Sequence, residues 1–191
     1  MTRIGIALLA ALLAFAGTNC SAGIPAQHGT ASVDWNAELQ KARAEIQQNP
    51  NSAFWHNQAG VAYDALGDFE SAVKELKTAA ALDASNPAHD YALYALYKRK
   101  ATLDQQREVL LDALERDPSN PVGRFEFASI LEREKHWADS LREYREAKRL
   151  AANVKGAEYI DPRGNPFPVS GVRVEVDKAI DRVAKLGASR K

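Results

Sequence analysis

Residues 53–86, AFWHNQAGVAYDALGDFESAVKELKTAAALDASN, decide the fold of this chain. Two more stretches of equal length, 87–120 and 121–154, follow without insertion and repeat its order of small, aromatic and aliphatic positions. The two joints are also alike, because DASNP at 83–87 and DPSNP at 117–121 each end one helix and place proline in the first turn of the next. A constant period of 34 residues is typical of stacked helical hairpins, so we predict an all-α repeat solenoid.

The spacing within each unit has a simple physical basis. Small residues at unit positions 8 and 20 let two antiparallel helices approach closely, and bulky residues at positions 11, 17 and 24 fill the remaining space. This spacing resembles the tetratricopeptide repeat (TPR), whose units bury their apolar faces by stacking on one another. The matching residues are Gly60, Tyr63, Gly67, Phe69, Ala72, Ala79 and Leu82 in the first unit, Tyr97, Leu110, Ala113 and Pro118 in the second, and Ala128, Leu131, Trp137, Tyr144 and Ala147 in the third.

The second unit departs from the pattern. Tyr94 stands at position 8 and Gln106 at position 20, where the family usually has small residues. We therefore expect the two helices of this middle unit to be splayed or locally repacked.

The stretch before the first unit fits the same frame. Residues 32–52 resemble the second half of a preceding unit, with Trp35 at position 17 and Pro50 at position 32. We expect a helix that is capped by Ser32 and ends near Gln47.

The C-terminal part is no repeat. Residues 155–169 are dense in glycine and proline, which excludes a continuous helix and leaves a linker, or a hairpin or ordered loop that folds back on the last unit with Phe167 as its anchor. Residues 170–187 regain a helical stripe and end at Gly187, as a helix that caps the array would. The stripe consists of Val172, Val176, Ala179, Ile180, Val183 and Leu186.

The N-terminus has the layout of an export signal. Arg3 precedes an apolar run at 4–16, and Cys20 to Ala22 are small residues. The run rises only about 20 Å as a helix, which is short of the roughly 30 Å core of a bilayer. We therefore predict a cleaved signal peptide at 1–22, a tether at 23–31, and a periplasmic or secreted protein.

Cys20 allows a second interpretation. A cysteine just after an apolar run resembles the lipidated cysteine of bacterial lipoproteins, although Gly17 stands where those signals carry a large aliphatic residue. Lipid on Cys20 would anchor the chain to a membrane. Since Cys20 is the one cysteine, an internal disulfide and a site built from several cysteines are both excluded.

The composition argues against several function classes. The 191 residues carry 25 Lys+Arg and 25 Asp+Glu, and this balance lacks the basic surplus that nucleic-acid binding requires. The histidines, His28, His56, His89 and His136, fall at unrelated unit positions, so we expect no catalytic or metal site. No glycine-rich phosphate loop is present, and we expect no cofactor.

The TPR resemblance implies a binding groove instead. In that family the first helix of each unit lines the concave surface through positions 2, 5, 9, 12 and 13. Carried over, these positions predict an aromatic strip beside a basic edge, which suits a protein or peptide segment with apolar side chains and some negative charge. The candidate residues are Phe54, Asn57, Val61 and Asp64, then Tyr91, Ala95, Lys98 and Arg99, then Phe125, Ser129, Glu132 and Arg133.

Two alternatives stay open at this point. Tyr91 and Phe125 could pack against the chain's own C-terminal part, which would fill the groove. The function itself is predicted to be that of an exported, non-catalytic adaptor with a protein or peptide ligand, and the alternative is a lipid-anchored component of an envelope assembly. In either case the membrane is reached only through the signal segment or through lipid on Cys20.

Overall fold

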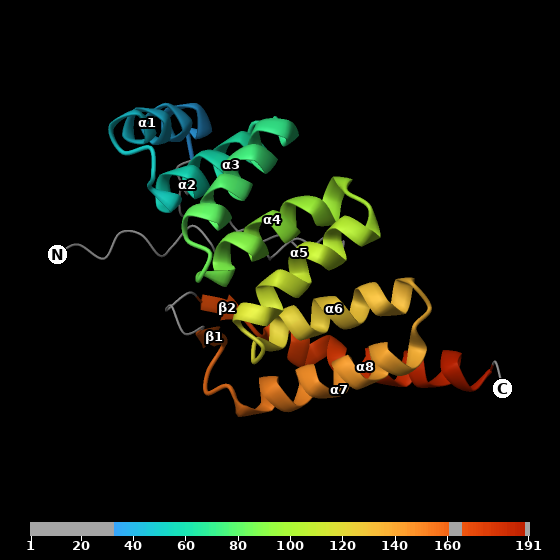
Figure 1. The fold of residues 1–191 in the computed structure, drawn as a ribbon. Helices are drawn as coiled ribbons and strands as arrows, with labels where there is room; N and C mark the ends of the chain where they lie inside the picture. Colours follow the sequence, from blue (N-terminus) through green and yellow to red (C-terminus); the bar gives the residue numbers. More distant parts are fainter. Residues whose placement is uncertain (1–32, 161–165, 190–191) are drawn as a thin grey trace, which may run out of the picture.

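The computed structural model describes residues 33–160 and 166–189. Helices follow one another as antiparallel neighbours and form a layered array with α1 at one end and α8 at the other (Figure 1). The predicted signal peptide and tether, with Cys20 and His28, lie outside the described residues. The helices are α1 (Trp35–Gln48), α2 (Ala53–Ala65), α3 (Phe69–Leu82), α4 (Pro87–Lys100), α5 (Leu103–Arg116), α6 (Pro121–Arg133), α7 (Trp137–Asn153) and α8 (Ser170–Ala188).

Polar side chains set the beginnings of most helices. Asn86 and Asn120 cap α4 and α6 in the same way, each accepting a backbone N–H and each followed by proline at the first helical position. The prediction that Ser32 caps the first helix is wrong. Helix α1 begins at Trp35, and Oδ1 of Asp34 accepts the backbone N–H groups of its first turn. The Asp34 carboxylate also faces the positive end of the helix dipole.

Close helix pairing depends on small residues. In α2, a Cβ on Gly60 would lie 2.7 Å from Cγ of Leu76, so only glycine allows α3 to approach this closely. In the third unit the hydroxyl of Ser140 on α7 donates to the carbonyl of Ala128 on α6 at 2.8 Å.

The middle unit is packed differently, as its sequence predicts. Helices α4 and α5 contact each other less than the two flanking pairs do. Tyr94 is buried and donates its hydroxyl to Glu126 of the next unit, while Gln106 turns back to the carbonyl of Ala101. Tyr94 therefore reaches the next unit while the amide group of Gln106 binds within its own, and α4 and α5 pack less extensively than the flanking pairs.

The helix connection inside the middle unit also differs from those inside the first and third units. The α2–α3 and α6–α7 connections each contain one residue with positive φ, Gly67 at 85° and Lys135 at 65°. The α4–α5 connection is shorter, and its Thr102 forms a capping box with Gln105.

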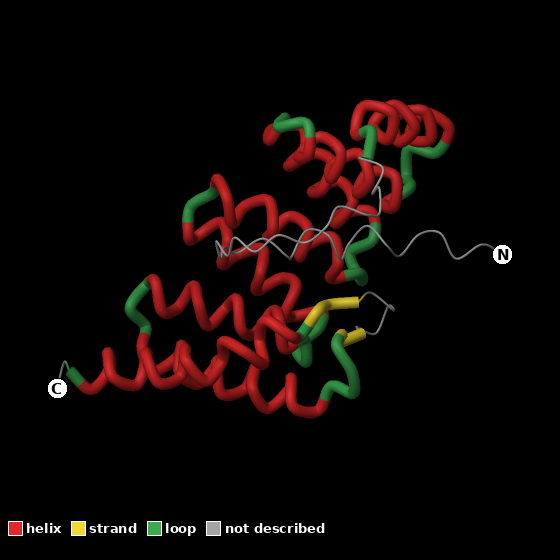
Figure 2. The backbone as a smooth tube through the Cα atoms, turned by 180° about the vertical axis from the view of Figure 1, so that it is seen from behind, coloured by secondary structure: helices red, strands yellow, loops and turns green. Residues whose placement is uncertain are grey.

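Two short strands lie in the described residues between α7 and α8, and we call this strand pair the hairpin. Strands β1 (Glu158–Ile160) and β2 (Pro166–Pro168) pair antiparallel with Tyr159 opposite Phe167. The hairpin lies beside the connection between α5 and α6 in both views of the backbone (Figures 1 and 2).

Helix α8 closes the array. It packs mainly on α7 and also contacts α6, and it continues through Gly187 to Ala188, one residue beyond the expected end. Val172, Val176, Ala179 and Val183 bury their side chains against α6 and α7. Within 33–160 and 166–189, no helix is both long and apolar enough to span a bilayer.

Candidate binding surface

The predicted groove residues fall into three classes of exposure. Asn57, Val61 and Tyr91 are buried, with at most 9% of their surface exposed. Asp64, Ala95, Phe125, Ser129 and Glu132 are partly exposed. The freely exposed members are Phe54, Lys98, Arg99 and Arg133. Only part of the predicted surface is therefore accessible from solvent.

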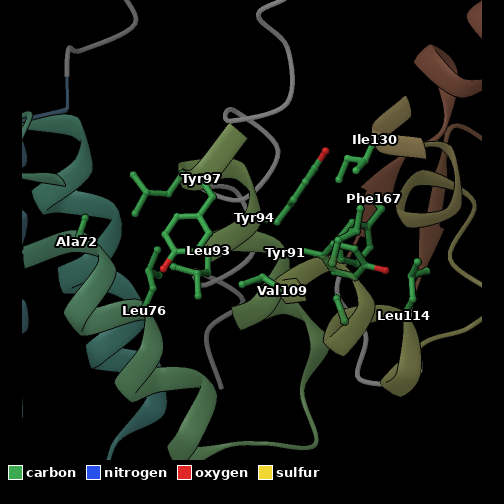
Figure 3. Close-up of a cluster of buried hydrophobic side chains, with 13 residues drawn as sticks. Ala72, Leu76, Tyr91, Leu93, Tyr94, Tyr97, Val109, Leu114, Ile130 and Phe167 are labelled. Carbon is green, nitrogen blue, oxygen red and sulfur yellow. The ribbon is translucent and has the colours of Figure 1, made fainter. Parts of the chain in front are cut away.

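Tyr91 is covered by the C-terminal hairpin. The ring of Phe167 meets it edge to face, with centroids 4.9 Å apart, and Phe167 is only 2% exposed (Figure 3). The hydroxyl of Tyr159 donates to Oδ1 of Asp117 at 2.7 Å and fixes the other strand. The alternative in which Tyr91 packs against the chain's own tail is the arrangement that the structure has.

Phe125 also packs against the end of the array. Its ring lies 5.2 Å from that of Tyr144 and borders the apolar cluster that α8 forms with α6 and α7. Among the predicted groove aromatics, Tyr91 is thus buried and Phe125 partly exposed, whereas Phe54 is 47% exposed.

The predicted basic edge is paired with carboxylates of neighbouring units. The amino group of Lys98 donates to both carboxylate oxygens of Glu126, at 2.7 and 2.9 Å, and Arg99 forms an ion pair with Asp64. Arg133 donates to the side-chain oxygen of Gln106 at 3.3 Å. The side chains of Lys98 and Arg99 remain 50% and 53% exposed, whereas those of Glu126 and Asp64 are only 17% and 16% exposed, so solvent reaches these pairs mainly from the side of the cations.

Glu132 joins three helices. It accepts the hydroxyl of Tyr144 at 2.9 Å and two guanidinium N–H groups of Arg182, at 2.6 and 2.8 Å. Hydrogen bonding from Arg182 lowers the pKa of Glu132, whereas burial beside that carboxylate raises the pKa of Tyr144. Glu132 therefore attaches α8 to the array, in addition to its predicted place on the groove wall.

Comparison with solved structures identifies the architecture. A thermophilic TPR protein from Thermus thermophilus aligns with a TM-score of 0.57 at 18% identity, over 76% of this chain and 73% of the other. This chain has the tetratricopeptide-repeat fold. The all-α solenoid predicted from the 34-residue period is confirmed.

Other TPR-like structures align comparably. MamA aligns with a TM-score of 0.55 at 12% identity, over 82% of this chain and 91% of MamA. The type III secretion translocator chaperone SycD of Yersinia enterocolitica aligns with a TM-score of 0.56 at 16% identity, over 77% of this chain and 88% of SycD. No model of a known protein family and no curated protein matches the sequence significantly.

The histidines of the TPR array lie apart from one another. His56 bonds through Nδ1 to Glu75 at 2.6 Å and through Nε2 to the carbonyl of Pro50 at 2.9 Å. His89 accepts the amide group of Asn57 at 3.1 Å, and His136 is exposed at the start of α7. Among the described residues, no three histidine, cysteine or acidic side chains form a group that could hold a metal ion.

Several residues of this surface escaped the sequence-based prediction. Asp117, Glu126, Tyr159 and Arg182 complete the contacts described above, but none of them occupies a groove position of a TPR unit. The glycine and proline density of residues 155–169, with Tyr159 and Phe167 on either side of the turn, indicated a hairpin anchored by Phe167 but did not indicate which residues it contacts.

Proposed function

We propose that this TPR chain is an exported, non-catalytic adaptor that binds a protein or peptide segment on its concave face. The observation that carries the proposal is the accessible basic edge on α4, where Lys98 and Arg99 remain half exposed although both are paired. The fold also supports it, since SycD, which shares the architecture, is a translocator chaperone. Fold alone does not define a task, so the accessible surface has to be tested directly.

The ligand chemistry follows from these side chains. A carboxylate on the ligand can approach Lys98 or Arg99 from the solvent side, because each cation keeps about half of its side chain exposed beside Glu126 or Asp64. Phe54 offers an apolar contact at the adjoining unit. We therefore expect an extended or helical segment that carries negative charge beside apolar side chains, and binding that weakens as salt rises.

Capture from a native envelope extract tests the proposal. The mature chain and a Lys98→Gln/Arg99→Gln variant would be used as baits, because glutamine removes the positive charge while retaining a hydrogen-bond donor for Glu126 and Asp64. Lys77→Gln/Arg145→Gln is a matched control that makes the same charge change at two exposed positions outside the groove. A protein held by the mature chain and the control, but lost from the groove variant, would support the adaptor. Identical captures from all three baits would contradict it.

Export is the second part of the proposal. It rests on the charged, apolar and small-residue layout of residues 1–22. The alternative function, a lipid-anchored component of an envelope assembly, rests on Cys20 following the apolar run. Intact mass spectrometry of soluble and membrane fractions separates the two. A soluble product that begins near Gly23 supports the exported adaptor, and a lipid-modified product that begins at Cys20 supports the alternative.

A further inference from the structure

The joint between the first two units is closed by polar side chains. Asn57, at position 5 of the first unit, donates its amide to Nδ1 of His89 at 3.1 Å. Nε2 of His89 lies 3.9 Å from Asp83 in the DASNP joint. Both Asn57 and His89 are buried, at 7% and 6% exposed.

At the joint between the second and third units, the same repeat positions make room for an aromatic ring. Tyr91 replaces Asn57, and Gly123 replaces His89, so no side chain projects from α6 at this point. A Cβ on Gly123 would lie 2.3 Å from the Tyr91 hydroxyl, which shows how closely the ring approaches α6. Phe167 and Tyr159 of the hairpin cover this joint, at Tyr91 and at Asp117 (Figure 3 shows Phe167 against Tyr91). We call Tyr91, Gly123 and Asp117 together the Tyr91 site.

The hairpin that covers the Tyr91 site is a small attachment. Each strand has three residues, and in the described part of the chain the two strands form a sheet of their own. A lone two-stranded hairpin has marginal stability in water, so its docking depends on side chains that reach the helices. Among the described contacts, Phe167 belongs to the main apolar cluster, Tyr159 packs against that cluster, and the Tyr159 hydroxyl donates to Asp117.

Helix α8 is anchored independently of the hairpin. The guanidinium of Arg173 donates to the carbonyls of Ala151, Val154 and Gly156, and Arg182 binds Glu132. A backbone bond from Val169 to Ala157, 3.0 Å long, closes the base of the hairpin. The hairpin can therefore leave the Tyr91 site while α8 stays in place.

We propose that the Tyr91 site is a docking site for an extended partner segment that carries an aromatic side chain, and that the chain's own hairpin competes with this segment. The hairpin indicates the chemistry of the ligand: a ring placed edge-on to Tyr91, and a phenol hydroxyl that donates to Asp117. This inference rests on the proposed adaptor function and adds an autoinhibitory contact to it.

A synthetic peptide of residues 157–169 tests the proposal in trans. We expect it to bind a Phe167→Ala chain at least about tenfold more tightly than the wild-type chain, measured by fluorescence anisotropy, because the variant exposes the site that the intact hairpin occupies. Glu158→Gln, an exposed change on the hairpin, is the control and should bind the peptide as weakly as the wild type. Equal binding to all chains, or none to the Phe167→Ala chain, would overturn the proposal.

Two further measurements cover the case in which Phe167→Ala does not fold. Tyr159→Phe keeps the ring, removes the hydroxyl that donates to Asp117, and should also increase peptide binding. In the wild-type chain, the amide hydrogens of β1 and of Phe167 in β2 should exchange at least about a hundredfold faster than those of α4 and α8, because the hairpin opens separately. Exchange as slow as that of α8 would exclude a displaceable hairpin.

The result separates this inference from the proposed function. If the peptide binds the Phe167→Ala chain but the extract yields no groove-dependent partner, the Tyr91 site stands and the adaptor function fails. If a partner depends on Lys98 and Arg99 but is captured equally by wild-type and Phe167→Ala chains, the adaptor function is supported. The hairpin then does not compete with that partner.

Discussion

Tyr91 on α4 and Phe167 on β2 lie edge to face with their ring centroids 4.9 Å apart, and this pair joins the middle of the repeat array to its C-terminal hairpin. Both rings are buried, although the segment that carries Phe167 has no place in the repeat pattern. The contact fills part of the surface that a TPR array normally presents to its ligands. Its strength can be measured.

Phe167→Ala should lower the free energy of unfolding by about 1–2 kcal/mol, which is less than the roughly 3–5 kcal/mol typical of a Phe→Ala change in a core. The loss is limited because a detached hairpin leaves α8 docked. Leu76→Ala, at a fully buried position between α2 and α3, is the reference and should cost about 2–5 kcal/mol. Urea unfolding followed by far-UV circular dichroism gives both values. Equal losses for the two variants would show that Phe167 belongs to the cooperative core.

Gly123→Ala should destabilise the chain by about 2 kcal/mol, because the new Cβ would lie 2.3 Å from the Tyr91 hydroxyl. Tyr91→Phe removes that hydroxyl and should recover part of the loss in the double variant. A double-mutant cycle from urea unfolding gives the coupling energy, which we expect to be about 1 kcal/mol. Strictly additive effects would mean that Gly123 is required for some other reason.

Asp90 should make stability depend on pH between about 4 and 6. Burial raises the pKa of this carboxyl to about 6, although Arg116, 2.6 Å away, acts in the opposite direction. Since the folded pKa is raised, the stabilising contribution is present below the ordinary Asp pKa and is lost as pH rises through 6. Relative to Asp90→Asn, the wild type should therefore lose about 1–3 kcal/mol between pH 4 and pH 7.5.

Urea unfolding of the wild type and Asp90→Asn at several pH values checks this. Asp112→Asn is a useful companion, because the charge of Asp112 also raises the pKa of Asp90. Its removal should reduce the change in unfolding free energy between pH 4 and pH 7.5. A difference between wild type and Asp90→Asn that stays flat from pH 4 to 7.5 would contradict the assignment.

Lys135→Gly should stabilise the chain by about 0.5–1 kcal/mol. Lys135 has φ of 65° in the α6–α7 connection, at the unit position where the first unit has Gly67 with φ of 85°. Glycine adopts this conformation without steric strain, and that gain exceeds the extra freedom it gives the unfolded chain. Thermal and urea unfolding should show the increase, and Gly67→Ala should show a decrease. A destabilised Lys135→Gly chain would mean that the lysine side chain makes a compensating contact.

The repeat part of the fold could be predicted because its causes are local. Gly60, Ala72 and Ala128 let paired helices approach closely. Asn86 and Asn120 cap the first helices of the next units, so the residues that set each unit's structure lie within that unit or next to it. The 34-residue period then repeats this pattern of residues along the chain. The same local logic predicted the repacking around Tyr94 and Gln106.

The accessible surface could be predicted only in part. Lys98 and Arg99 are exposed as expected, but their partners Glu126 and Asp64 come from neighbouring units, and a list of groove positions does not reveal such pairs. Residue type and unit position predict which side chains belong to the groove. They do not indicate what a side chain meets there.

The sequence by itself determined an array of TPR-like helical hairpins with a closing helix, because helix propensity, capping and close helix approach depend on residues a few positions apart or on the neighbouring unit. Only the tertiary structure decided which of the predicted groove residues are exposed. Phe167 covers Tyr91 and Arg182 binds Glu132 through contacts between segments far apart in the chain, whose free energies depend on burial and geometry that residue order does not specify.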